Sequence, residues 1–210
     1  MPSYGILRSS SNSGTDADLI SVFTAPLSIL SNKPTYSNET VTLKRRSIYT
    51  DIQRWEIQTG IAPVADATAL LVHNVINGYT DTFFIRMPQL YRKSTLPGTM
   101  FPKVFNTVSA KEDELYVKDL GSYTLPVGEF IRFSGHSKVY MIQSSERVDG
   151  PLNKIKVFPK LVKPVNLNES VSYGYKVAMP VKYGDDSKIG VTYTDGILAQ
   201  IDSITLVEAL

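Results

Sequence analysis

The clearest pattern of hydrophobic and polar positions runs from Arg54 to Ile61. Apolar side chains and one threonine alternate there with polar residues or glycine, in the order Arg-Trp-Glu-Ile-Gln-Thr-Gly-Ile. A period of two is typical of a β-strand with one buried and one wet face. Together with the preceding Val41–Leu43 and Ile48, it predicts a long antiparallel hairpin from Glu39 to Ile61. The three cations Lys44-Arg45-Arg46 fall near the end of its first arm.

After Pro63 the period of the pattern changes. Ala67, Leu71 and Val75 recur every four residues, and Gly78 follows at a position suited to a helix C-terminus. This spacing predicts a helix over residues 64–77. The apolar run from Thr82 to Met87 predicts a buried strand that Pro88 stops.

The second half of the chain contains short strand patterns at close spacing. Residues 89–106 lack periodicity and contain prolines, so they are predicted to be a linker. Turn signals separate the later strands, which is typical of a sandwich or barrel. The predicted strands are Glu114–Lys118, Glu129–Phe133, Lys138–Ser144, Lys154–Phe158, Ser170–Lys182, Ile189–Tyr193 and Ile201–Val207.

The composition agrees with a mostly β protein. Valine and isoleucine total 35 residues, whereas alanine and glutamate total 18. Branched side chains fit a pleated sheet and lose rotamer freedom in a helix. We therefore expect a β-barrel or sandwich formed by residues 1–88 and 166–210, with a small β-module inserted at 107–165.

The composition also excludes several function classes. With no cysteine, the chain has no disulfide, no thiol nucleophile and no cysteine-bound metal. A net charge of +2 over 210 residues argues against a dedicated non-specific DNA-binding domain. The sequence contains no run of about 18 apolar residues and no recognisable export signal, so we expect a soluble protein.

A search for catalytic chemistry gives no positive sign. His73 and His136 lack partner motifs, and the interpretation we favour for each is a surface or cap residue. The pair Asp185-Asp186 does not continue into a calcium-loop spacing, and no phosphate-binding glycine motif occurs. We therefore predict no enzyme activity, no metal and no cofactor.

Two segments could serve contacts between chains. Residues 8–18 are almost wholly polar and are interpreted as a surface loop or as an arm that orders on a neighbouring subunit. Lys44-Arg45-Arg46 is the densest basic cluster. It fits the wet face of an edge strand, contact with an acidic neighbouring subunit, or nucleic acid passing nearby.

One stretch resembles a known family. Thr42-x-x-Arg45-Arg46 leads into Gln53-Arg54-Trp55-Glu56-Ile57, followed by Pro63, the predicted helix and Thr82-Phe-Phe-Ile-Arg-Met-Pro88. This order resembles the start of bacteriophage tail and baseplate proteins of the distal tail protein group. The later β-patterns are similar to a module that recurs in phage tail proteins and to the C-terminal strands of that group.

The resemblance implies a tail-tube-like barrel with one flanking helix, assembled into a ring that is most often hexameric. It implies a structural subunit of a tail tip or baseplate, located in the virion tail, assembled in the host cytoplasm and contacting tail-tube and baseplate proteins. The subunit-interface candidates are Lys44, Arg45, Arg46, Arg54 and Trp55. Neither membrane contact nor specific nucleic-acid binding is expected, although DNA could pass through the lumen.

Two alternatives stay open at this point. Within the same class, the chain could be a tail tube, tail-terminator or sheath-to-tube connecting ring protein. From another class, it could be a carbohydrate-binding receptor module, because 12 tyrosines include the alternating Tyr173 and Tyr175. Such tyrosines are more often packing residues, since rings supply much of the apolar area in cores.

Overall fold

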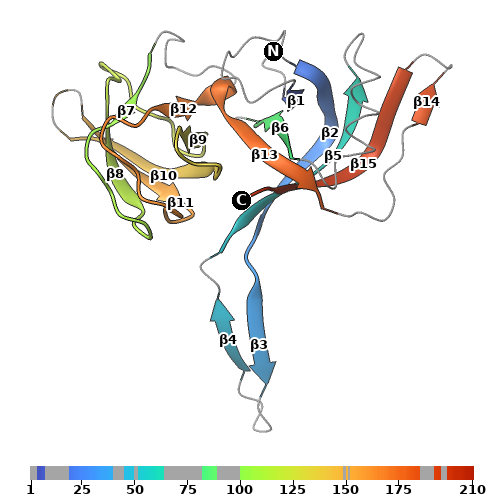
Figure 1. Cartoon of the computed structure of the whole chain (residues 1–210), viewed down its shortest axis with the longest axis horizontal. Helices are drawn as coiled ribbons and strands as arrows, with labels where there is room; N and C mark the ends of the chain where they lie inside the picture. The colour runs from blue at the N-terminus through green and yellow to red at the C-terminus, as the bar shows by residue number, and fades with distance from the viewer. Residues whose placement is uncertain are drawn as a thin grey trace.

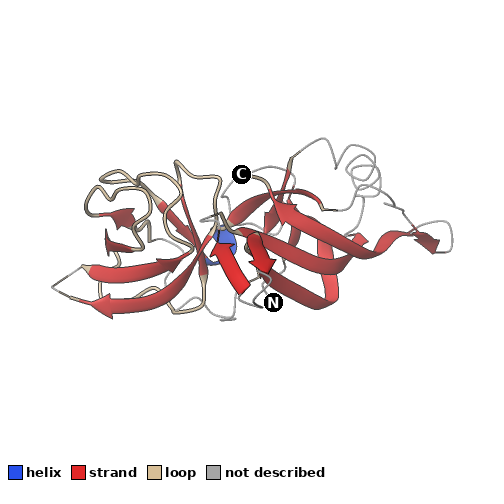
Figure 2. Cartoon of the chain, turned by 90° about the horizontal axis from the view of Figure 1, so that it is seen from below, coloured by secondary structure: helices blue, strands red, loops and turns tan. Residues whose placement is uncertain are grey.

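The computed structural model describes residues 4–7, 19–39, 45–49, 52–63, 82–88, 100–148, 150, 152–184, 192–194 and 198–210. The described chain is mostly β and forms two larger sheets and one small one. A single turn of 3-10 helix, η2 (Gly174–Lys176), is the one helical element among the described residues. The two larger sheets lie side by side (Figure 2).

The first sheet forms a nearly closed barrel. Its order is β13-β6-β1-β2-β5-β15-β14, and β13 also pairs with β15. The apolar side chains of alternate positions fill its centre, among them Ile6, Ile57, Ile85 and Leu206, which are all 0% exposed. The strands are β1 (Gly5–Leu7), β2 (Leu19–Asn32), β5 (Arg54–Pro63), β6 (Phe83–Arg86), β13 (Ala178–Tyr183), β14 (Thr192–Thr194) and β15 (Leu198–Glu208).

The second sheet has its own core. Its order is β12-β9-β10-β11-β8-β7, and a bridge between Lys103 and Ser170 joins its two ends. Val104, Leu115, Ile131 and Ile155 are among the buried residues inside it. The strands are β7 (Lys103–Val104), β8 (Glu114–Lys118), β9 (Phe130–Phe133), β10 (Tyr140–Arg147), β11 (Asn153–Phe158) and β12 (Val171–Tyr173). We refer to this unit as the second barrel.

A hairpin projects from the first barrel (Figure 1). It consists of β3 (Thr35–Glu39) and β4 (Arg45–Tyr49), which pair only with each other among the described strands. β3 continues the direction of β2 and β4 leads into β5, so the hairpin is an extension of two barrel strands.

The predicted alternation in β5 is confirmed, but the predicted partner of this strand is wrong. Trp55, Ile57, Thr59 and Ile61 are buried as expected. β5 pairs with β2 from Asn32 to Ser21 and with β15 on its other edge, whereas the described part of the predicted first arm, β4, pairs with β3. The pattern therefore located one strand and its buried face but not the strand that pairs with it.

Two other predictions need correction. Residues 170–182 form two strands in different sheets rather than one strand, because η2 separates β12 from β13. Gly174 has φ +59 in this turn, which is a conformation that glycine adopts without steric cost. The predicted linker over 89–106 contains β7, so its last part belongs to the second barrel.

Several predictions fall outside the described residues. The predicted helix over 64–77 and the polar segment 8–18 both lie there, as do His73 and the pair Asp185-Asp186. The predicted flanking helix therefore stays a prediction.

Candidate functional site

Apolar packing, hydrogen bonds and an ion pair join the two barrels at one junction. Phe130, Val139, Met141 and Phe158 of the second barrel pack against the apolar cluster of the first. The Trp55 ring meets the Phe130 ring edge-on with centroids 5.2 Å apart, and the Phe158 ring at 5.9 Å. Such edge contacts add to the stabilisation from apolar burial. The two units are therefore packed against each other rather than merely tethered.

Trp55 links the barrels by a hydrogen bond as well. Its indole Nε1–H donates to the carbonyl of Val139 at 2.8 Å, and the residue is 4% exposed. β5 holds Trp55 because the alternation of this strand turns Trp55 and Ile57 to the same buried side. Almost none of this predicted subunit-interface residue is left to contact another chain.

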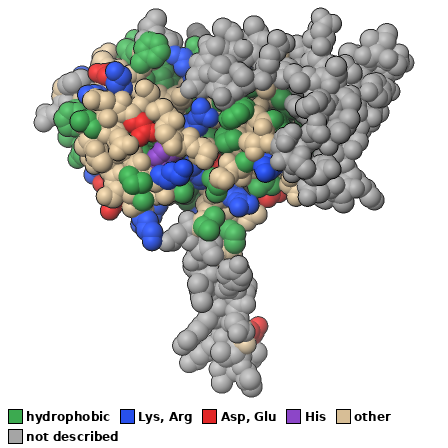
Figure 3. All heavy atoms as spheres, viewed as in Figure 1, with side chains coloured by type: hydrophobic (Ala, Val, Ile, Leu, Met, Phe, Trp, Pro, Cys, Tyr) green, Lys and Arg blue, Asp and Glu red, His purple; other side chains and the backbone are tan. Residues whose placement is uncertain are grey.

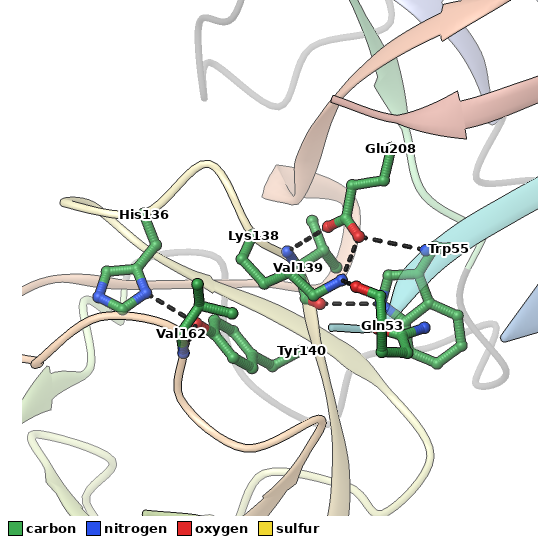
Figure 4. A network of polar contacts seen from close by, with 8 residues as sticks. All are labelled: Gln53, Trp55, His136, Lys138, Val139, Tyr140, Val162 and Glu208. Atoms are coloured by element: carbon green, nitrogen blue, oxygen red, sulfur yellow. Dashed lines mark hydrogen bonds and ion pairs between the residues drawn. The ribbon is translucent and has the colours of Figure 1, made fainter. Parts of the chain in front are cut away.

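A buried ion pair lies next to Trp55 (Figure 4). Lys138 Nζ of the second barrel pairs with Glu208 Oε2 at the end of β15, and the two side chains are 2% and 0% exposed. Glu208 also accepts hydrogen bonds from the backbone N–H of Val139 at 2.8 Å and of Trp55 at 3.2 Å. Lys138 Nζ donates a second bond to the Gln53 carbonyl at 2.9 Å. Each charge thus has several partners drawn from both barrels.

Burial and pairing act in opposite directions on these two groups. Burial raises the pKa of Glu208 and lowers the pKa of Lys138, whereas their mutual attraction and hydrogen bonds oppose both shifts. A buried charge is tolerated only when it is paired and hydrogen-bonded. The arrangement therefore requires both residues in place at the junction.

His136 belongs to a second polar chain inside the second barrel. Its Nδ1 lies 2.8 Å from the Tyr140 hydroxyl and its Nε2 lies 3.2 Å from the Pro164 carbonyl. The backbone N–H of Val162 donates to the Tyr140 hydroxyl at 3.2 Å. Because a carbonyl only accepts, Nε2 carries the proton and Nδ1 accepts from Tyr140. Burial lowers the pKa of His136, which favours this neutral form.

The prediction of His136 as a surface or cap residue is wrong. The residue is 6% exposed, and both ring nitrogens have structural partners. With its two nitrogens occupied, it has no free nitrogen to serve as a general base or metal ligand in this arrangement.

The predicted basic interface residues lie on or near the projecting hairpin. Arg45 and Arg46 begin β4, opposite Glu39 and Asn38 of β3. Lys44 lies outside the described residues. Arg54 is exposed and opens β5, close to the base of the hairpin. In β5 the exposed Arg54 is therefore available at the surface, whereas its neighbour Trp55 lies inside the junction.

Lys33, which sequence reasoning did not single out, lies between β2 and β3. Its Nζ is 4.5 Å from the centroid of the Phe158 ring in the second barrel. This cation–π contact joins the root of the hairpin to the junction. No local signal in the sequence indicates it, because the two residues are far apart along the chain.

Glu129 is a buried carboxylate that the sequence analysis also missed. It is 0% exposed, and neither carboxylate oxygen has a hydrogen-bond partner among the described residues. Burial raises its pKa to about 7. The sequence Pro-Val-Gly-Glu looks like an ordinary polar turn, so only the tertiary structure shows that the side chain is enclosed.

No group of three or more His, Asp or Glu side chains among the described residues could hold a metal ion. No helix of the described chain is long and apolar enough to cross a membrane. On the face drawn in Figure 3, the basic side chains are spread among polar and apolar ones rather than gathered in one area.

No protein-family model matches the sequence, and no curated protein matches it.

Proposed function

We propose that this chain is a structural subunit of a bacteriophage tail tip or baseplate ring, connecting the tail tube to the distal host-recognition apparatus. In this proposal the first barrel is tail-tube-like, with the predicted helix over 64–77 on its flank. The proposal rests on the sequence resemblance together with one feature of the fold, the projecting hairpin.

The hairpin is the observation that carries the proposal. β3 and β4 form a two-stranded sheet of their own, five residues long in each strand. A two-stranded ribbon is at best marginally stable alone in water, and no other described strand pairs with either of its edges. Contact with a second chain would supply the missing partners. A barrel with such an extension suits a ring, in which each subunit reaches its neighbour by the same contact.

The junction supports a connecting role. The buried pair Lys138–Glu208 and the Trp55 contacts hold the two barrels in one orientation. A connector must present surfaces to different partners at a fixed angle, which two freely jointed units could not do. In this proposal the first barrel and its hairpin contact the neighbouring subunits of the ring, and the second barrel contacts other tail proteins.

Within the same class, a tail tube, tail-terminator or sheath-to-tube connecting ring protein is the alternative. The co-purifying tail component distinguishes it from the proposed role. For the carbohydrate-binding alternative, Tyr173 is 3% exposed and packs in the core of the second barrel, whereas Tyr175 is 39% exposed and lies in η2.

Native mass spectrometry and negative-stain imaging test the proposal. The wild-type chain, alone or mixed with tail-tube protein, should form closed rings. Replacing residues 35–49 with a short Gly-Ser linker should give monomers that keep both barrels, as judged by the fluorescence of Trp55. The matched control replaces the exposed Lys111, Lys160 and Lys163 with serine and should keep the rings. Monomers from the wild-type chain under both conditions would contradict the proposal.

A further inference from the structure

The outer face of β7, β8 and β11 carries an ordered set of lysines and aromatic rings. β7 and β8 lie on the side of the second barrel away from the first (Figure 1). In β8 and β11 the buried positions alternate with less buried ones, which places Tyr116, Lys118, Lys154 and Lys156 on the outer face. Lys103 and Phe105 follow the same alternation around the buried Val104. We call these six residues the lysine–aromatic face.

Strand register places two lysines directly opposite each other. Lys103 of β7 pairs with Lys118 of β8, and neither has a carboxylate partner among the described residues. The β-carbons of directly opposite residues are about 5 Å apart, and like charges at such positions destabilise a sheet. Lys154 and Lys156 differ, because Glu114 and Asp113 pair with them at 2.7 and 3.6 Å. The opposed pair thus has a cost in stability that the fold itself does not offset.

The next row of the same face is aromatic. The backbone N–H of Phe105 donates to the Tyr116 carbonyl at 2.8 Å, which places these residues on neighbouring strands. Phe105 is 45% exposed, although a phenyl ring normally contributes to a core. Two residues along a strand span about 6.7 Å, so each ring lies about one such step from a lysine of the opposed pair.

The chemistry of this face selects the occupant. Lysine is a donor without an acceptor, and the carboxylates of Glu114 and Asp113 are engaged in ion pairs. A further carboxylate, Glu146, lies opposite Lys154 on β10, two strands away from β8 and the opposed pair. Sugar hydroxyls require both donors and acceptors, whereas a phosphate requires donors only. The face spans three strands about 4.8 Å apart, a width of about 10 Å, so its area is well below the roughly 800 Å² that each partner buries in a stable protein interface. A thin chain that alternates phosphates with flat rings fits both the size and the chemistry.

We propose that the lysine–aromatic face binds single-stranded nucleic acid, with a phosphate between Lys103 and Lys118 and a base on the ring of Phe105. This interaction goes beyond the proposed structural role and does not depend on it. It is compatible with the net charge of +2, which sums over the whole chain and does not describe one face. Nothing on the face reads base edges, so binding is independent of sequence and weakens with salt.

Fluorescence anisotropy with labelled oligothymidylate and oligouridylate tests this proposal. If two phosphate charges are neutralised, the affinity should fall about sevenfold between about 50 and 200 mM salt. Phe105→Ala should weaken binding about fivefold or more through the lost stacking. Binding of both probes supports recognition of the shared chemistry, and a preference for one identifies DNA or RNA as the ligand.

A double substitution separates this site from general surface charge. Lys103→Gln with Lys118→Gln should remove most of the binding and its salt dependence, while the midpoint of thermal unfolding stays unchanged or rises. The matched control, Lys160→Gln with Lys163→Gln, changes two exposed lysines elsewhere on the second barrel and should bind as the wild type does. Absence of wild-type binding at low salt, equal loss in both double variants, or binding of heparin but neither oligonucleotide would overturn the proposal.

Discussion

Lys138 and Glu208 belong to different barrels and are 70 residues apart, yet they form an ion pair that is almost fully buried at the junction. Because the pair is buried at the junction, it can fix the orientation of the two barrels, which a surface ion pair could not do. An exposed pair contributes little because water screens it, whereas a buried charge that loses its partner stays desolvated. The orientation of the two barrels is therefore coupled to the presence of both charges.

Removing one member of the pair should destabilise the whole protein. Glu208→Gln leaves the Lys138 ammonium buried without its carboxylate, and we expect a loss of about 3–5 kcal/mol in the free energy of unfolding. Urea unfolding followed by circular dichroism measures it. Lys154→Gln is the control, because its pair with Glu114 is partly exposed and should cost less than about 1 kcal/mol. Equal small effects in both variants would show that the buried pair does not hold the junction.

Trp55→Phe should weaken the junction by a smaller amount. Phenylalanine keeps a ring at this site but has no N–H, so the Val139 carbonyl loses its donor. An unsatisfied buried acceptor costs about 1–3 kcal/mol. The midpoint of urea unfolding, with an unchanged slope, measures the loss. A variant as stable as the wild type would mean that the hydrogen bond contributes nothing to the packing of the barrels.

Trp55 is also the single tryptophan, so its fluorescence in the wild type reports on the junction alone. If the barrels separate only when the chain unfolds, the fluorescence and circular dichroism transitions should coincide. A fluorescence change at lower urea than the loss of β-structure would contradict the coupling of the two barrels.

The sequence indicated β5 clearly but not its neighbour β2. β5 alternates because one face lies on the core along its whole length, whereas β2 leaves the barrel and its residues from Ser31 onward are exposed. The register between these strands also shifts between Thr24 and Ser28, around Pro26. A proline within a run weakens the strand signal. The pattern therefore predicted β5 but did not predict its partner β2.

The junction itself could not be predicted from local sequence. Lys138 begins a predicted strand and Glu208 directly follows one, positions at which a charged residue normally faces water, and only the packing of the two barrels buries them. The same holds for Lys33 and Phe158, which meet across the base of the hairpin. Patterns report which face of a strand is buried, but they do not report which other element covers the opposite face.

Gly174→Ala should strain the turn that carries the chain from the second barrel to the first. Gly174 has φ +59, and an alanine in this left-handed conformation costs about 1–2 kcal/mol. Thermal unfolding should show a lower midpoint. Gly128→Ala is the comparison, because Gly128 also has positive φ, and it should lower the midpoint by a similar amount. Gly135→Ala is unsuited to this purpose, because its new β-carbon would lie 2.8 Å from Glu169 Oε1. A neutral Gly174→Ala would show that the turn relaxes freely.

Glu129 should make the stability of the protein fall as pH rises. Burial raises its pKa from the ordinary value of 4.5 to about 7, so the folded state holds a proton that the unfolded state has already released. Stability from this group is complete below about pH 4.5, decreases up to about pH 7 and is constant above it. At 1.36 kcal/mol per pKa unit, the total change is of the order of 3 kcal/mol.

Glu129→Gln isolates this effect, because glutamine keeps the shape of the side chain and has no proton to lose. The lowered pKa of His136 acts in the opposite direction, costing stability as pH falls below its ordinary value of 6.5, but it is present in both proteins. The difference in unfolding free energy should therefore be near zero at about pH 4 and favour Glu129→Gln by up to about 3 kcal/mol at about pH 8. Glu112→Gln, which removes an exposed carboxylate, should follow the wild-type profile. A difference that does not change with pH would show that folding leaves the pKa of Glu129 at its ordinary value.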